Sequence, residues 1–240
     1  MLGEPTDTAT APKMAIITMT DDKNHNLEAA ALHKLTAWLS PGYPVGAFAF
    51  SHGLEQAVAA GEIMDAATAT DWIAACLRHG SGRNDAILLA HAWKATDQEG
   101  VVEINELACA LAASSERHLE TTMQGTAFMR TTGAVWDSEK NPLAYPVAVG
   151  SEARRHSIGL APTLSLFLHA FVANLVSACI RLVPLGQTEG QQVTAGLFNA
   201  MDEIAAEAAK TPLDDIGGCA FRSDLASMKH ETKYSRLFRS

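Results

Sequence analysis

The apolar residues of this chain recur at helical spacing along most of its length. Two clear faces are made by Leu27, Ala31, Leu35, Trp38 and Leu39, and by Val193, Leu197, Met201, Ile204 and Ala208. Spacings of three to four residues place such side chains on one side of an α-helix. The short apolar run 47–50 lies too close to prolines for a strand, and no other segment alternates. The pattern predicts an all-α fold, a single-domain bundle of about ten helices without internal repeats.

Capping and breaking residues give the expected helix boundaries. Ser51 and Gly61 bound a short helix, and Asp85 marks another helix start. Two capping boxes are expected, Thr68 with Asp71 and Thr188 with Gln191. Pro146 suits the first turn of a helix that breaks at residues 157–159. Gly125 and Gly133 weaken the stretch from Val101 to Trp136, so two helices are expected there. Residues 211–218 are expected to form a linker.

Residues 163–183 are the most apolar run, and a run of about 20 residues would fit a membrane span. A narrow polar stripe interrupts it, made by Ser165, His169, Ser177 and Arg181, with Asn174 as a further polar group. Hydrocarbon disfavours such groups. The favoured interpretation is therefore a central core helix with one side on a polar seam, and no membrane partner.

The composition is that of an ordered globular protein, with 48% hydrophobic and 19% charged residues. A net charge of −9 argues against general nucleic-acid binding, which needs a basic surface. The four cysteines lie far apart without a C-x-x-C pair, which favours free thiols in a reducing cytoplasm.

The chain divides by composition into three stretches. Residues 1–26 are rich in Thr, Ala, Pro and Asp, and their one apolar run is too short for a signal-peptide core, so a disordered leader is expected. Residues 27–221 would form the helical core. Residues 222–240 would form a C-terminal tail that belongs to the same domain.

The loop within residues 35–61 has a constrained backbone, because Pro41, Gly42, Pro44 and Gly46 fall within six positions. It carries four apolar side chains, namely Tyr43, Val45, Phe48 and Phe50. Exposed apolar clusters on loops mark interaction sites, but the same side chains could also fold back into the core. Both interpretations stay open from the pattern alone.

The C-terminal tail has a different charge from the rest. Five basic and two acidic residues give residues 222–240 a net charge of +3, which leaves −12 on the remainder. Met228, Tyr234, Leu237 and Phe238 lie among these charges. The tail could lie on its own acidic body, or it could become ordered when a partner docks.

Sequence motifs for several catalytic classes are missing. The chain contains no P-loop, no H-E-x-x-H, no Cys/His cluster and no G-x-S-x-G. Two weaker possibilities remain: a small α-helical enzyme that uses Ser51, His52 and Glu55, or a metallochaperone that stores a metal ion. His52 and Glu55 could share a metal, and His230 and Glu231 could do so with residues of a partner, although an ordinary capping or surface histidine is favoured in each case.

Three separated motifs resemble those of the F-type urease accessory proteins, the UreF family. Residues 40–55, SPGYPVGAFAFSHGLE, resemble the signature S-P-x-x-P-V-G-x-F-x-x-S-x-G-L-E. Residues 181–191, RLVPLGQTEGQ, resemble an internal motif, and YSRLFRS after HET resembles the C-terminus of the family. The resemblance runs from about residue 35 to residue 240, with the motifs in the same order.

The resemblance implies a non-catalytic assembly factor without a cofactor of its own. Such a protein is an all-helical homodimer that binds a D-type accessory protein (UreD, also called UreH) and recruits a G-type GTPase (UreG). The complex docks on apo-urease, and GTP hydrolysis by the partner is coupled to nickel insertion. Either stimulation or restraint of the GTPase is compatible with the sequence.

The motifs also imply which residues bind partners. They are Pro44, Gly46, Phe48, Ser51, Gly53, Leu54 and Glu55 in the loop and the helix behind it, Leu185, Gly186 and Gln187 in the second motif, and Lys229, His230, Glu231, Tyr234, Ser235, Arg236 and Leu237 in the tail. We expect Arg236 to anchor the tail by charge-assisted hydrogen bonds, and Tyr234 and Leu237 to fill pockets of a partner or of the loop.

Overall fold

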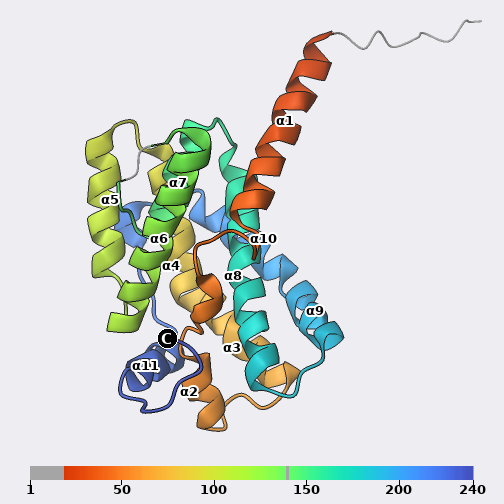
Figure 1. Ribbon diagram of the computed structural model, residues 1–240, viewed down its shortest axis with the longest axis vertical. Helices are drawn as coiled ribbons and strands as arrows, with labels where there is room; N and C mark the ends of the chain where they lie inside the picture. The colour runs from red at the N-terminus through yellow and green to blue at the C-terminus, as the bar shows by residue number, and fades with distance from the viewer. Residues whose placement is uncertain (1–18, 139–140, 240) are drawn as a thin grey trace, which may run out of the picture.

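A computed structural model describes residues 19–138 and 141–239. Over these residues the chain forms eleven α-helices, two short 3₁₀ helices and no strand, which confirms the predicted all-α class (Figure 1). The α-helices are α1 (Met19–Trp38), α2 (Leu54–Ala59), α3 (Ala66–His79), α4 (Ser81–Lys94), α5 (Gln98–Ala110), α6 (Ser115–Trp136), α7 (Tyr145–Arg155), α8 (Leu160–Leu182), α9 (Gln187–Gly196), α10 (Phe198–Ala208) and α11 (Phe221–His230). The 3₁₀ helices are η1 (Ala47–Ala49) and η2 (Leu213–Asp215).

Helix α4 lies at the centre of the bundle, where it contacts α3, α5, α7, α8 and α10. Its consecutive residues Ile87, Leu88 and Leu89 are all buried, so more than one side of the helix packs into the core. Helix α8 is the second long core element and packs against α4, α9 and α10. One continuous hydrophobic core therefore joins the helices into a single bundle.

Helix α8 is the one described helix that is long and apolar enough to cross a membrane, and 56% of its most apolar window is buried inside the protein. Its buried residues include Phe167, Leu168, Val172 and Leu175. The structure thus places this segment in the core, as the polar stripe predicted.

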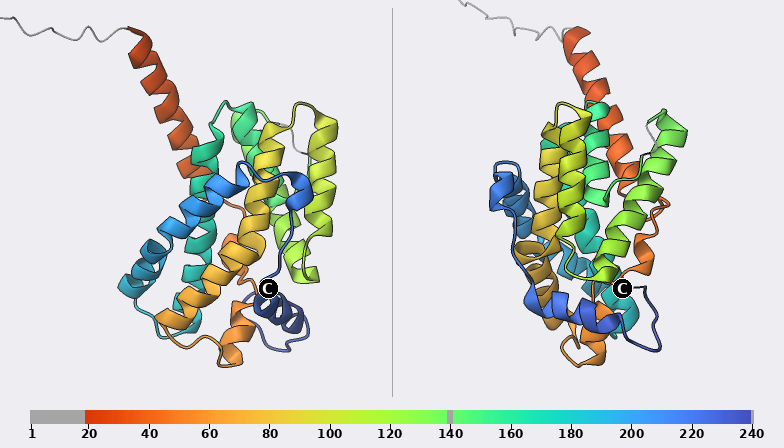
Figure 2. Two further views of the ribbon diagram at one scale, coloured as in Figure 1. Left: turned by 180° about the vertical axis from the view of Figure 1, so that it is seen from behind. Right: turned by 90° about the vertical axis from the view of Figure 1, so that its left-hand side faces the viewer.

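The two described ends of the chain lie at opposite ends of the bundle. Helix α1 projects away from the body, whereas α11 and the C-terminal residues pack beside α2 at the other end (Figures 1 and 2). Helix α1 begins at Met19, so the expected leader is already helical over residues 19–26, and residues 1–18 lie outside the described residues. The sequence from 19 to 38 contains neither Gly nor Pro, and nothing in it stops the helix from extending past the boundary expected at Leu27.

Several predicted helix starts are wrong by about one turn. The capping box of α3 joins Asp65 and Thr68, whose backbone N–H donates to Asp65 Oδ1 (2.9 Å). Helix α4 begins at Ser81 rather than at Asp85. Helix α9 has Glu189, not Gln191, accepting from the Gly186 N–H (2.8 Å). The reason is that cap-forming residues recur one turn apart in these segments, and spacing alone does not separate the cap from the first turn.

The stretch from Val101 to Trp136 forms parts of two helices, as predicted, but the break lies elsewhere. Helix α5 ends at Ala110, and Ser114 caps α6 by accepting the Arg117 N–H (3.1 Å). Likewise, the apolar face from Val193 to Ala208 is buried but is divided between α9 and α10.

Gly125 lies inside α6 because another segment approaches it closely, and it does not break the helix. A Cβ at this position would lie 1.8 Å from the Leu143 carbonyl oxygen, ahead of α7. Gly150 of α7 has the same role against α4, where a Cβ would lie 2.3 Å from the Leu89 carbonyl oxygen. The helix-propensity cost of glycine is offset here by close packing between backbones.

We predict that Gly125→Ala destabilises the protein by about 3 kcal/mol, since overpacking against a rigid carbonyl forces α6 and α7 apart. Gly196→Ala is the matched control, because Gly196 also lies in a helix but has no neighbouring atom within 4 Å of the position that a methyl group would take. It should change the free energy of unfolding by less than about 1 kcal/mol. Denaturant unfolding of the two variants measures both values, and equal effects would contradict this account.

Candidate partner-binding surface

Residues 39–53 connect α1 to α2 through a loop with a locally fixed backbone. The Tyr43 N–H donates to the Ser40 carbonyl (3.0 Å), the Val45 N–H donates to the Tyr43 carbonyl (2.8 Å), and Gly46 takes a left-handed φ of 79° before η1. Val45 and Phe50 are buried, and the Tyr43 hydroxyl bonds Thr132 Oγ1 (2.8 Å). Most of the apolar side chains of the loop therefore fold back into the core, which is one of the two interpretations that the sequence left open.

Phe48 is the exception in the loop, because 65% of its surface is exposed. Its ring lies against the guanidinium of Arg181 from α8, with 3.6 Å between Cζ and the ring centroid. The same guanidinium lies over the Phe238 ring from the tail (4.2 Å), and Arg181 Nη1 donates to the Phe48 carbonyl (3.0 Å). Arg181 thus holds the loop and the tail together through two cation–π contacts and one hydrogen bond.

Helix α2 begins at Leu54, and its N-cap is Gly53 rather than the predicted Ser51. Gly53 has φ 77°, and a Cβ there would lie 2.7 Å from the Ser227 backbone nitrogen of α11. Ser51 is fully buried, and its Oγ accepts the Glu55 N–H at 3.4 Å. Gly53 is thus the point at which α11 packs directly on the backbone ahead of α2.

The carboxylate of Glu55 lies in the first turn of α2 and gathers donors from the tail. It accepts the backbone N–H groups of Leu237 (3.0 Å) and Phe238 (2.9 Å), and it pairs with His230 Nε2 (3.2 Å) and Lys233 Nζ (3.3 Å). Burial by itself raises the pKa of Glu55, but the two backbone N–H groups, the hydrogen bond to His230 and the charge of Lys233 together hold the pKa below its usual range. Glu55 is therefore an ionised anchor for the tail.

A second carboxylate, Glu116 in the first turn of α6, completes the anchor. Its oxygens lie 3.0 Å from His230 Nδ1 and 2.8 Å from Arg236 Nη1, which is the anchoring contact expected of that arginine. His230 is fully buried between Glu55 and Glu116. Each ring nitrogen of His230 therefore lies within hydrogen-bond distance of one of the two carboxylates.

The tail thus lies on its own acidic body, yet it presents apolar side chains outward. Tyr234 is fully exposed and Leu237 is 67% exposed, although their neighbour Phe238 is buried. We define the tail surface as the exposed apolar side chains of the tail and of the elements beside it, namely Phe48, Met123, Phe221, Leu225, Met228, Tyr234 and Leu237. Met123 belongs to it because Arg239 Nη1 lies 3.9 Å from its sulfur.

The structure separates the sequence-predicted site residues into three groups. Ser51, Gly53, Leu54, Glu55 and His230 are buried, and of these Gly53 and Glu55 contact the tail, to which His230 belongs. Pro44, Gly46, Phe48, Lys229, Glu231, Tyr234, Ser235, Arg236 and Leu237 are exposed on or around the tail and the loop. Leu185, Gly186 and Gln187 form the α8–α9 turn, and among the described residues no hydrogen bond or ion pair joins them to the tail.

Sequence reasoning missed Glu116 and the role of Arg181. Glu116 lies in no motif, and only the packing of α6 beside α11 brings it to His230. Arg181 is the first residue of the second motif. Its position in the last turn of an apolar helix was the one sequence signal that could have indicated its role.

The catalytic and metal alternatives are not assembled in the described residues. The two nitrogens of His52 face Glu120 (2.8 Å) and Ser81 (3.4 Å), whereas Glu55 faces the tail. Glu231 accepts the Ser115 N–H (2.8 Å), so it turns away from His230. Within the described ranges, no group of three or more His, Cys, Asp or Glu side chains could hold a metal ion.

We predict that Gly53→Ala loosens α11, because its methyl group would clash with the α11 backbone in addition to straining a left-handed residue. Gly61→Ala is the matched control, since Gly61 has φ 73° but open space around it. The control should cost about 1–2 kcal/mol from strain alone, whereas Gly53→Ala should cost clearly more and speed hydrogen exchange in α11. Equal costs, with α11 protected in both variants, would contradict the close contact.

We predict that Glu55→Gln releases the tail while the body stays folded. Hydrogen exchange of the Leu237 and Phe238 amides should become about tenfold to a hundredfold faster, because the variant loses about 1–3 kcal/mol of charge-assisted bonding. The control is Glu62→Gln, which removes a solvent-exposed pair with Arg222 and should change the free energy by less than about 1 kcal/mol.

The same anchor predicts an acid limit for tail docking. The pKa of Glu55 is lower in the folded chain than its ordinary value of 4.5, so its contribution is fully present above pH 4.5 and is lost as the pH falls through the lowered pKa. The protection factors of the tail amides in unmodified protein, which compare each exchange rate with that of a free peptide at the same pH, should therefore decrease on acidification only below about pH 4.5. Protection factors that already decrease between neutral pH and about pH 5 would show that another group controls docking.

Comparison with known proteins shows the family to which the chain belongs. The UreF family model matches residues 63–198. The urease accessory protein UreF of Rhodopseudomonas palustris (strain BisA53) is 50% identical over 224 residues, covering 88% of this chain and 94% of that protein. The UreF of Cereibacter sphaeroides (strain KD131) is 52% identical over 212 residues, covering 88% of this chain and all of that protein. Over half of the chain matches the family model and most of it aligns with these relatives, so the chain belongs to the UreF family of urease accessory proteins.

Proposed function

We propose that this chain is a non-catalytic scaffold for urease maturation in the cytoplasm. It binds a D-type accessory protein (UreD or UreH) through the tail surface, and as a homodimer it recruits and regulates a G-type GTPase (UreG). The assembly supports GTP-dependent nickel insertion into apo-urease. The observation that carries the proposal is the tail surface: exposed apolar side chains on a backbone that is already anchored, in a member of this family.

The anchoring of the tail supports a binding role for the side chains that it leaves exposed. Glu55 and Glu116 fix the backbone around Tyr234 and Leu237, so binding a partner does not have to order the whole tail. A preordered segment loses less conformational entropy on association, and tyrosine with arginine nearby is favoured at interface centres. The basic residues Lys229, Arg236 and Arg239 around this surface favour a partner with acidic groups at the rim of its site.

The lack of catalytic motifs in this chain also supports the proposal, because it leaves the chemistry to the partners. The chain has no P-loop, so nucleotide hydrolysis belongs to the GTPase partner. The histidines considered as catalytic or metal-binding residues are instead engaged with buried carboxylates. What this chain offers to the assembly is therefore a shaped surface.

The experiment is a binding measurement with purified D-type protein. Tyr234→Ser combined with Leu237→Ser should weaken association at least about tenfold, because buried aromatic and aliphatic anchors each contribute more than about 1 kcal/mol at interfaces. Both side chains are exposed in the free chain, so its thermal stability should stay unchanged. Val135→Ser is the matched control, since Val135 is 60% exposed near the other end of α6.

Point substitutions are preferable to deletion of residues 232–240. Deletion would also leave Glu55 without its backbone donors and remove Phe238 from Arg181, so loss of binding could then follow from a disturbed body. Unchanged association of the double variant would refute the tail surface as the binding site. Hydrolytic activity or tight stoichiometric nickel binding by the isolated chain would instead favour the enzyme or the metallochaperone.

A further inference from the structure

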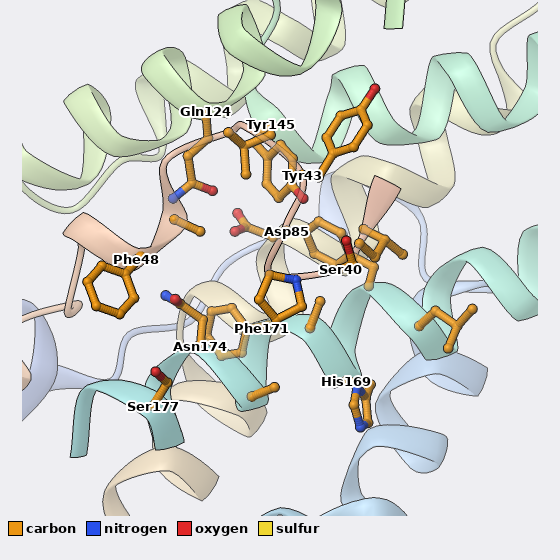
Figure 3. A pocket seen from close by; sticks show the side chains of 18 of the residues that line it. Ser40, Tyr43, Phe48, Asp85, Gln124, Tyr145, His169, Phe171, Asn174 and Ser177 are labelled. Atoms are coloured by element: carbon orange, nitrogen blue, oxygen red, sulfur yellow. The ribbon is translucent and has the colours of Figure 1, made fainter. Parts of the chain in front are cut away.

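A cavity of about 450 Å³ opens between the constrained loop, α6, α7 and α8, and it is separate from the tail surface except at Phe48. Figure 3 shows its wall of rings, with Tyr43 from the loop, Tyr145 from α7 and Phe171 from α8 around the space. Its volume lies within the range of ligand-binding pockets, roughly 300–1,000 Å³. Mostly apolar walls with a few convergent polar groups are the usual composition of such a site.

The floor of this cavity is charged, with two buried residues, His52 and Glu120, and two partly buried ones, Asp85 and Arg117. It is made by His52 from the segment ahead of α2, Asp85 from α4, and Arg117 and Glu120 from α6. Arg117 Nη1 and Glu120 Oε2 form a close ion pair, and Glu120 Oε1 lies 2.8 Å from His52 Nε2. Burial and the charge of Arg117 lower the pKa of His52, so this imidazole is neutral at neutral pH.

Asp85 is left with an incomplete set of partners. Its one ion pair among the described residues joins Oδ2 to Arg117 Nη2 at 3.6 Å, which is too long for a hydrogen bond. Its carboxylate points into the cavity between the rings, as Figure 3 shows. The Arg117 charge is already engaged by Glu120 and also faces Asp224, so one cation serves three carboxylates.

The surplus of negative charge at the floor decides what the cavity can accept. An anionic ligand would be repelled, and a purely apolar ligand would leave Asp85 buried with no hydrogen-bond donor, which is unfavourable. A ligand with a cationic head on an aliphatic stem suits both the apolar walls and the charged floor, since its stem contacts the rings while its charged head meets the carboxylate.

We propose that this cavity binds a lysine or arginine side chain presented by a protein partner, with the aliphatic stem against Tyr43 and Phe171 and the cationic head on Asp85. The cavity is larger than a single aliphatic stem fills, and the apolar residues Leu166 and Phe48 also line it. Apolar residues that flank the basic residue in the partner's chain would occupy this remaining space. A protein segment therefore fits the walls better than a free amine does. This inference does not depend on the proposed function.

The binding should depend on pH through Asp85. Burial raises the pKa of Asp85 to about 6, with the Arg117 charge opposing that rise, so the carboxylate is ionised at pH 7.5 and protonated at pH 5. The other groups that face it are Glu120 at the floor and Asp224, His169 and Tyr145 at the edges. Burial raises the pKa of Glu120, but the charge of Arg117 outweighs this and lowers it to about 2. Affinity for a cation should fall as the pH decreases through about 6.

The test uses the full chain and two synthetic peptides, acetyl-Ala-Leu-Lys-Leu-Ala-amide and the same peptide with norleucine in place of lysine. These differ only in the ammonium group, and binding is followed by NMR shifts of the amides that line the cavity. At pH 7.5 the lysine peptide should bind at least about tenfold more tightly than the norleucine peptide. The preference should disappear at pH 5 and in Asp85→Asn, and it should return in Asp85→Glu.

Each other outcome overturns part of the assignment. Equal binding of both peptides, or of neither, would show that Asp85 selects no cation. If n-butylammonium alone binds as tightly as the lysine peptide, the cavity is a site for a free amine and not for a protein segment. If the NMR signals of the amides that line the cavity shift when the protein concentration is raised without peptide, and added peptide reverses that shift, the occupant is a second copy of the chain. Thermal melting of Asp85→Asn shows whether that variant is folded.

Discussion

The carboxylate of Glu55 is the contact on which the architecture of the tail end of the bundle depends. A single side chain in the first turn of α2 accepts two backbone N–H groups and faces an imidazole and an ammonium group from a segment about 180 residues later in the sequence. A buried carboxylate is costly unless such partners surround it, so Glu55 and the tail stabilise each other only as a set. The same set positions Tyr234 and Leu237 outward, where they are available to a partner.

Arg181 extends this interdependence to the core. It lies in the last turn of the central apolar helix α8, and its guanidinium lies between the ring of the loop residue Phe48 and the ring of the tail residue Phe238. The three motifs that resemble the UreF family therefore converge partly in space: the loop, the arginine of the second motif and the tail meet, whereas Leu185, Gly186 and Gln187 remain at the α8–α9 turn. The cavity above the charged floor of His52, Arg117 and Glu120 is lined by the same loop. Because Phe48 of this loop also belongs to the tail surface, the cavity and the tail surface share this residue.

Much of the fold was predictable because helices depend on local spacing. The apolar faces of α1, α8, α9 and α10, the helical class and the two breaks around α7 follow from periodicity and from breakers. Boundaries were less predictable, since Thr68 and Asp85 resemble caps although they lie inside helices. Gly125 was misread as a weak point because its reason is the Leu143 carbonyl, a contact that no local pattern displays.

By itself, the sequence determined the all-α class, the position of the constrained loop, the basic character of the tail and the family resemblance, because each depends on residues close together in the chain. Only the tertiary structure decided that the tail lies on its own body, that Glu116 joins Glu55 around His230, and that Asp85 faces a cavity with incomplete pairing. These are contacts between residues far apart in sequence. Their energies depend on burial and on distances of about 3 Å, which arise only when the helices pack.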